Sequence, residues 1–256
     1  MIETAKIHQT VTTHRGEVSF TLIKVEKGTF LMGDNKLKIT VPTFYMAEFP
    51  VTQALWEAIT GDNPSDFKGQ NRPVERVSWN DINGIDEGKH LDFLRKLNKL
   101  NEKTDCIFRL PSESEWEYAA IGGHLAKKNK DGFHVAEYDY AGSNRLEDVG
   151  WYDYNSNQET KDVGQKMPNR LGLYDMSGNV WEWCEDRWHG ELRTIVPNDM
   201  PRDGKPWLGD KKGSRRVYRG GSWSGHPQYC RVPDRTFWYP DRRRNIIGFR
   251  LACAFL

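Results

Sequence analysis

The sequence contains few cysteines and few aliphatic residues. Its 256 residues include 4 cysteines, and hydrophobic residues make up 37% of the chain. No CxxC spacing joins Cys106, Cys184, Cys230 and Cys253, so a zinc or redox motif is not indicated. Buried free thiols are the interpretation that we favour, and one disulfide stays open as the alternative.

Long apolar runs and an excess of one charge are also missing. No run approaches the roughly 18 residues of a spanning helix, and no charged-then-apolar leader opens the chain. We therefore expect no membrane span: the chain as written fits a cytoplasmic protein, and the cell surface stays open if a leader was removed. Lys and Arg total 37 against 36 for Asp and Glu, which predicts no specific nucleic-acid partner. We interpret the basic residues within 211–216 and 242–244 as solvated or ion-paired.

Aromatic residues are plentiful, with 10 Trp, 10 Tyr and 11 Phe. Each ring buries a large area, so a loop-rich fold can build its core from few residues. The length suffices for a sizeable core. Because neither a Pro/Ser-rich linker nor a repeat occurs, we predict a single domain over residues 1–256.

Local patterns predict short strands, short helices and long loops. Strands are expected at 18–25, 29–33 and 40–46, where β-forming residues alternate or cluster. Helices are expected at 53–59, after Thr52 and before Gly61, and at 86–100 with an apolar stripe. The polar, Gly-rich stretch 122–169 predicts long loops.

Two capping boxes are readable, at Ser78–Asp81 and at Ser112–Glu115. The second is followed by acidic residues, and Glu113, Glu115 and Glu117 could suggest a paired-carboxylate catalyst. Capping explains Glu115, and acids favour the first turn of a helix. We therefore predict no catalysis by these residues.

The final forty residues contain a stretch whose composition is atypical of core strands. Between Arg219–Trp223 and Gly248–Arg250, polar, aromatic and basic residues follow no apolar period. Such residue types combine rigid contact area with adaptable hydrogen bonding, as in antibody binding loops. We predict a variable ligand-binding region over 219–250, formed by Ser224, Gly225, His226, Tyr229, Asp234, Thr236, Phe237, Trp238, Tyr239, Arg243, Arg244 and Ile246.

The side chains of the binding region and of its framework should differ in solvent exposure. We expect six residues to be substantially exposed and close together: Tyr229, Asp234, Thr236, Phe237, Trp238 and Tyr239. The framework rings should be buried instead, because the low aliphatic content leaves the core dependent on them. These framework rings are Trp181, Trp183, Trp223 and Phe249.

Seven motifs in order resemble the formylglycine-generating-enzyme, or sulfatase-modifying-factor, family. They are FLMGD (30–34), FPVTQALWEAITG (49–61), PVERVSWNDI (73–82), RLPSESEWEYAA (109–120), GLYDMSGNVWEWCED (172–186), YRGGSW (218–223) and GFRLA (248–252). The resemblance implies an α+β C-type-lectin-like fold, with a small twisted antiparallel sheet, few helices and long ordered loops.

The oxidases of this family bind copper through two cysteines near the C-terminus. By position, Gly225 replaces the first cysteine, and Cys230 occupies the place of the second. One thiolate cannot supply both soft ligands of a copper(I) site. We therefore expect no copper and no enzymatic activity; the alternative is a copper-dependent oxidoreductase that uses Cys230.

The C-terminal text also resembles the variable proteins of diversity-generating retroelements, which come from bacteria and phages. In those systems adenines of a template are miscopied, mostly in Asn codons, and Lys, Glu and Met cannot arise from AAC. Residues 224–247 contain no Lys, Glu or Met, although Gln228 and Trp238 need another codon. We interpret the chain as a binder of a protein or other surface ligand; a lectin-like domain of fixed specificity is the other alternative.

A calcium site is a further implication of the resemblance. Its ligands would be the side chains of Asp175 and Glu182 with the carbonyls of Gly178 and Val180. Hard oxygen ligands on a tight loop suit calcium. The alternative is a loop held by hydrogen bonds alone.

Overall fold

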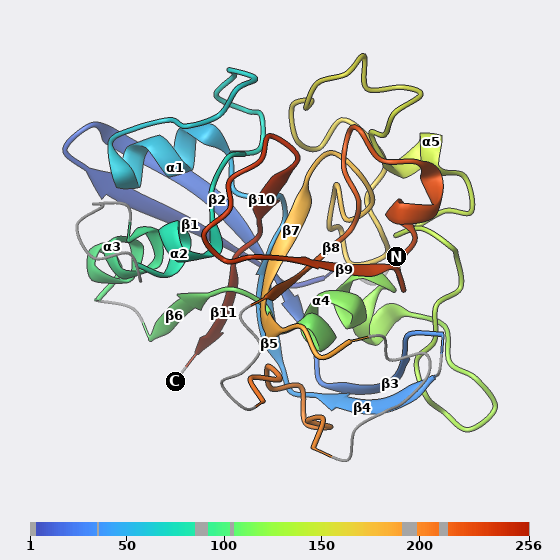
Figure 1. The fold of residues 1–256 in the computed structure, drawn as a ribbon. Coiled ribbons are helices and arrows are strands. Elements are labelled where there is room, and N and C mark those ends of the chain that lie inside the picture. The colour runs from blue at the N-terminus through green and yellow to red at the C-terminus, as the bar shows by residue number, and fades with distance from the viewer. Residues whose placement is uncertain are drawn as a thin grey trace.

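The computed structural model describes residues 4–34, 36–84, 92–102, 105–190, 199–209 and 215–255. It has the predicted α+β, C-type-lectin-like architecture, with short helices, small sheets and long ordered loops (Figure 1). A five-stranded sheet has the order β1-β2-β5-β11-β6, a four-stranded sheet the order β10-β7-β8-β9, and a hairpin joins β3 to β4. The strands are β1 Lys6–Thr13, β2 Gly16–Val25, β3 Gly28–Met32, β4 Leu37–Val41, β5 Phe44–Ala47, β6 Cys106–Arg109, β7 Trp181–Arg187, β8 Arg216–Arg219, β9 Arg235–Trp238, β10 Ile247–Phe249 and β11 Ala252–Phe255.

The strand expected at 40–46 is in fact two strands in two different sheets. β4 ends at Val41 and β5 begins at Phe44, with Pro42 between them. Proline has no backbone N–H for a ladder, so the chain leaves one sheet and enters another. The expectations at 18–25 and 29–33 are confirmed by β2 and β3.

The helices begin where their caps predict. Thr52 caps α1 and Gly61 ends it in the left-handed conformation, while Ser78 and Ser112 form the two expected capping boxes. Of the helix expected at 86–100, residues 86–91 lie outside the described part; α3 begins at Phe93, after Asp92, and ends at Leu100 as expected. The helices are α1 Gln53–Thr60, α2 Trp79–Asn83, α3 Phe93–Leu100, α4 Glu113–Ala120 and α5 Leu146–Val149, with 3-10 turns η1 Gly123–Leu125 and η2 Pro227–Cys230.

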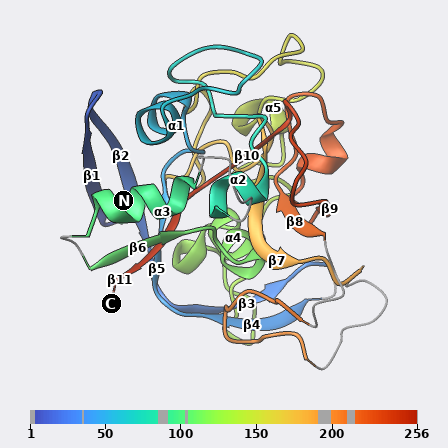
Figure 2. The ribbon, with the colours of Figure 1, turned by 60° about the vertical axis from the view of Figure 1, so that its left-hand side comes forward.

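Aromatic rings fill the core, as expected. The buried residues form two large clusters. The first cluster contains Trp56, Phe93 and Phe249, the second contains Phe30 and Trp116, and all five side chains are essentially inaccessible to solvent. Figures 1 and 2 show α1 and α3 beside the five-stranded sheet, and Figure 1 shows α4 below β7 and β8. α4 contacts both the β3–β4 hairpin and the four-stranded sheet, so it joins these two parts of the fold.

Three of the four framework rings are buried as predicted, and Trp223 is not. Trp181, Trp183 and Phe249 are buried, whereas Trp223 is only partly covered. The Trp223 ring contacts Phe67 edge-on, and its Nε1 donates to the carbonyl of Asn245 at 2.9 Å. Its hydrogen-bond partner therefore holds it in a surface layer above the core.

The favoured interpretation of free buried thiols holds for two cysteines, and the alternative of one disulfide holds for the other two. Cys184 and Cys230 are free and buried, but Cys106 and Cys253 form a disulfide across 147 residues of sequence. The antiparallel pairing of β6 with β11 brings these two cysteines together. Sequence spacing does not reveal a contact of this range. Within the described part of the chain, no helix is long and apolar enough to cross a membrane.

Candidate ligand-binding surface

Residues 219–250, here called the C-terminal segment, are fixed at both ends by a fully buried arginine. Arg219 ends β8, and Arg250 directly follows β10. The side chains of both are 0% exposed. A buried guanidinium is costly unless it is paired and hydrogen-bonded, so the partners of these two residues decide where the segment can lie.

Arg219 is held by α4. Its guanidinium donates to the carboxylates of Glu113 and Glu117, each at 2.6 Å, and to the carbonyl of Val232 at 2.7 Å. The two glutamates lie four residues apart, so they share one face of α4. Glu113 also accepts two hydrogen bonds from Arg235 on β9. Burial alone would raise the pKa of Glu113, but the guanidinium groups of Arg235 and Arg219 lower it to about 2.

Arg250 is held by Glu182 on β7. The two side chains are joined at 2.8 Å, and Trp116 Nε1 donates to the same carboxylate at 2.7 Å. The Arg250 guanidinium also donates to the backbone carbonyls of Ala47, Glu48 and Tyr174. Glu113 and Glu117 of α4, which resembled part of a paired-carboxylate catalyst in the sequence, thus pair with Arg219, whereas Glu182 of β7 pairs with Arg250. The charged residues of YRGGSW and GFRLA could have indicated this.

Several backbone carbonyls of the segment between the arginines help to hold it in place. Residues outside it, or at its first turns, donate to its carbonyls: Arg219 to Val232, Trp223 to Asn245, Asn80 to Pro240, Arg76 to Arg244 and Asp153 to Gly225. A carbonyl is the same whichever side chain its residue bears. Most of these contacts are therefore independent of the side chains that the segment displays.

The first part of the segment meets a neighbouring loop. Ser224 and His226 are exposed, and His226 Nδ1 lies 2.6 Å from the carboxylate of Asp153. Tyr229 on η2 is 43% exposed. Tyr154, beside His226, is 74% exposed, which makes it a surface residue that sequence reasoning missed. No motif marked it, because it lies outside the segment in sequence.

Gly221 is required for this turn. Its φ is +77°, and a Cβ there would lie 2.4 Å from the Cys230 sulfur. The close approach of η2 to the Gly220-Gly221 turn therefore depends on the absence of a side chain.

The second part of the segment is less exposed than expected. Phe237 packs against Trp188 with ring centroids 4.6 Å apart, and Trp238 packs against the first core cluster. Successive side chains of β9 point to opposite faces, and each face covers a different cluster. The prediction of substantial exposure is therefore wrong for Phe237 and Trp238; Thr236 and Asp234 are also partly covered.

Of the remaining predicted binding residues, some are exposed to solvent and others hold the segment against the framework. Tyr239 is 48% exposed and Arg244 is exposed. Arg243 makes a bidentate ion pair with Asp81 of α2 at 2.5 and 2.6 Å, and Ile246 packs against the first cluster. The displayed residues thus include Tyr229, Tyr239 and Arg244, while Arg243 and Ile246 anchor the loop before β10.

The donor set at the copper position is incomplete. Gly225 has no side chain, and a Cβ there would meet only ordinary contacts with Ser222. Cys230 is completely buried, and burial raises the pKa of its thiol to about 12. A copper(I) ion needs accessible thiolate, so this position offers one poor ligand.

The two side chains expected to bind calcium, those of Asp175 and Glu182, already make other contacts in this arrangement. Both oxygens of Glu182 accept hydrogen bonds from Arg250, and one also accepts from Trp116. The guanidinium therefore occupies the place that a cation would need. Asp175 accepts from the Gly164 backbone N–H at 2.8 Å, and burial raises its pKa to about 6. These are the contacts of a loop held by hydrogen bonds.

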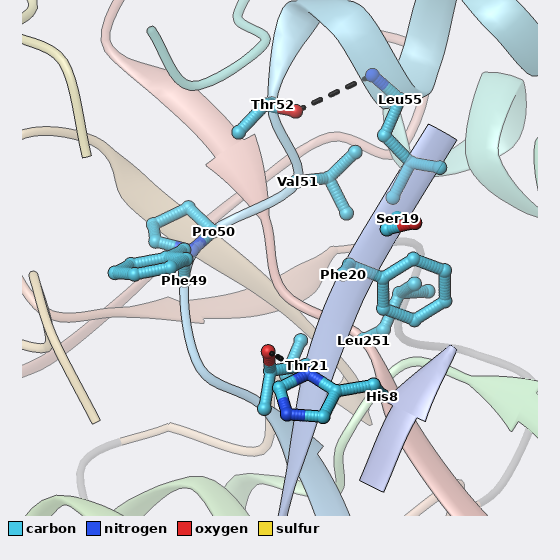
Figure 3. Close-up of a pocket in the computed structure, with 11 residues that line it drawn as sticks. His8, Ser19, Phe20, Thr21, Phe49, Pro50, Val51, Thr52, Leu55 and Leu251 are labelled. Atoms are coloured by element: carbon cyan, nitrogen blue, oxygen red, sulfur yellow. Dashed lines mark hydrogen bonds between the residues drawn. The ribbon is translucent and has the colours of Figure 1, made fainter. Parts of the chain in front are cut away.

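A separate pocket lies away from the segment. Its volume is about 180 Å³, and mostly apolar side chains line it between β2 and the chain before α1 (Figure 3). Phe20, Phe49 and Leu55 contribute to its wall, and His8 lies at its edge. None of the twelve predicted binding residues lines this pocket.

Comparison with known proteins identifies the scaffold. Residues 8–255 match the family model described as "Sulfatase-modifying factor enzyme 1-like domain". The solved structure of Treponema denticola variable protein 1 is similar, with a TM-score of 0.77 and 31% identity, covering 96% of this chain and 99% of that one. The two predicted resemblances, to the family and to a variable protein, are thereby confirmed.

Two curated relatives carry different names on the same scaffold. Chaperone protein LppX of Paenibacillus barcinonensis is 32% identical, over 79% of this chain and 84% of its own length. The formylglycine-generating enzyme of Thermomonospora curvata is also 32% identical, over 79% of this chain and 62% of its own. This chain therefore matches less than two thirds of that enzyme.

Replacing Arg219 by Lys should destabilise the protein by about 3 kcal/mol or more, because one buried ammonium cannot serve two carboxylates and a carbonyl. Urea denaturation measures the difference. Arg231→Lys is the matched control: Arg231 belongs to the same segment but forms an exposed pair with Asp139, which should change stability by less than about 0.5 kcal/mol. Equal small losses in both variants would show that α4 does not anchor the segment.

Proposed function

Because this chain belongs to the sulfatase-modifying factor enzyme 1-like domain family, we propose that it uses the family scaffold to bind a ligand through the C-terminal segment. The observation that carries this proposal is the backbone anchoring of the segment between Arg219 and Arg250. A surface held by its carbonyls can change its side chains without losing its position. That property suits a binding surface, as in antibody loops carried by a fixed framework.

The displayed residue types support binding. Tyr229 and Tyr239 are among the exposed large apolar residues, and Tyr154 adds a third ring beside His226. Tyrosine supplies contact area at a small entropic cost and is enriched at protein interfaces. The ligand that we propose is a protein or another surface molecule.

Diversification by a retroelement is the finer part of the proposal. It is supported by the absence of Lys, Glu and Met from residues 224–247 and by the likeness to a variable protein. The DNA beside the gene tests it: a reverse transcriptase and a near-copy of the segment that differs at adenines are expected. Their absence would favour a binding domain of fixed specificity, of which the LppX relative is one model.

Display outside the reducing cytoplasm agrees with the disulfide between Cys106 and Cys253. Structural disulfides persist in oxidising compartments and are rare in the cytosol. A binder of surface ligands would meet its target there.

The proposal excludes the family's oxidase activity. A peptide that carries a sulfatase-type cysteine motif should remain unmodified after incubation with the protein, copper and oxygen, because Gly225 provides no thiol. Mass spectrometry of the peptide measures this. Gly225→Cys is the informative variant, since the position has room for a side chain. Copper-dependent aldehyde formation by the wild-type protein would contradict the proposal.

Replacing Tyr229 and Tyr239 together by Ser should abolish selection of ligands from a phage-displayed library of random peptides and leave the fold intact. Both rings are more than two-fifths exposed, so stability should change by less than about 1 kcal/mol. The matched control is Leu100→Ser with Ile107→Ser, whose side chains are 48% and 47% exposed on α3 and β6. Loss of binding in the control alone, or unfolding of the tyrosine variant, would contradict the assignment.

A further inference from the structure

β9 is the last strand of the four-stranded sheet. Within the described residues it pairs with β8 on one side, and no strand pairs with its other side. Figure 2 shows it beyond β8 at the right-hand margin of the molecule. No backbone hydrogen bond from another described residue reaches the outer side of 235–238, and all four residues are partly exposed. An edge of this kind is a template for an added strand.

Two arginines that have no acidic partner among the described residues flank this edge. The Arg215 guanidinium lies over the Phe237 ring at 4.2 Å, and that of Arg244 over the Trp238 ring at 5.3 Å. Phe237 and Trp238 are neighbours in β9, so their rings and the attached arginines lie on opposite faces of the sheet. Within the described ranges, neither Arg215 nor Arg244 has a carboxylate within ion-pair distance.

Other arginines of the C-terminal segment do pair with carboxylates. Arg219, Arg235 and Arg243 are each paired with a carboxylate at 2.6 Å or less. Those pairs hold the segment in place. The two guanidinium groups on the β9 rings contribute no such pairing, and stacking on a ring keeps each in a fixed orientation. Among the described residues, no carboxylate therefore competes with a ligand for their donors.

We infer that β9 accepts an extended acidic segment of a partner protein, which adds to the sheet as a strand beside it. Alternate side chains of an added strand would reach the two faces, where carboxylates can pair with Arg215 and Arg244. Backbone hydrogen bonds would supply affinity, and the two guanidinium groups would select acidic sequences. This inference rests on the proposed function and specifies the chemistry of the ligand.

A nucleic acid fits the β9 edge and its two arginines less well than an acidic peptide does. Phosphate groups could meet the guanidinium groups, but a sugar–phosphate backbone carries no N–H donors to pair with the carbonyls of a strand edge. The overall charge of +1 also gives no general attraction to polyanions.

The probe is a synthetic peptide of alternating Glu and Val, compared with peptides in which Gln or Lys replaces Glu. Calorimetry should show binding of the acidic peptide and at least about tenfold weaker binding of the other two. Hydrogen–deuterium exchange should show slower exchange of amides within 235–238 when the acidic peptide is bound. Arg215→Glu and Arg244→Glu should each weaken binding about tenfold or more.

Arg202→Glu is the control, because Arg202 is also exposed and lies beside β4, away from this edge. It should leave the affinity unchanged. Binding without protection of 235–238, equal binding of the Lys peptide, tighter binding of a single-stranded oligonucleotide, or no binding of the acidic peptide would each overturn the inference. If displayed peptides are still selected through Tyr229 and Tyr239 in any of these cases, the proposed function stands and only the β9 inference fails.

Discussion

The burial of two guanidinium groups is the constraint on which the rest of this structure depends. Arg219 and Arg250 are inaccessible to solvent and mark the two ends of the C-terminal segment. A buried charge left without its partner costs several kcal/mol, so Glu113, Glu117 and Glu182 must lie where they do. Their positions in turn fix α4 against β7 and β8. The same ion pairs therefore order the core and set the frame of the displayed surface.

In this arrangement, the groups that hold the C-terminal segment in place differ from the side chains that face a ligand. The frame binds the segment through carbonyls such as those of Val232, Pro240 and Asn245, while Tyr229 and Tyr239 point outward. Support is not wholly independent of side chains, since Arg235 and Arg243 pair with framework carboxylates. Residues 235 and 243 should thus tolerate fewer substitutions than 229 or 239, because a change there removes a charged partner of a buried carboxylate.

Relatives on this scaffold include an enzyme, a chaperone and a variable protein, so the fold does not decide the activity. In this chain, three local features bear on the activity that we propose. Gly225 supplies no thiol where the oxidases have a cysteine, and the Arg250 guanidinium pairs with Glu182. Within the described residues, Arg215 and Arg244 lie on aromatic rings without a carboxylate partner.

The sequence by itself determined the features that depend on neighbours in the chain. Thr52, Ser78 and Ser112 predict their helix starts because a cap bonds amides two or three residues away. Ordered motifs determined the family, and residue composition marked the C-terminal segment. Only the tertiary structure decided the contacts that join distant residues: the Cys106–Cys253 disulfide, the partial burial of Phe237 and Trp238, and the exposed place of Tyr154 beside His226. These depend on which strands pair and which faces they cover, and no local pattern encodes a strand's partner.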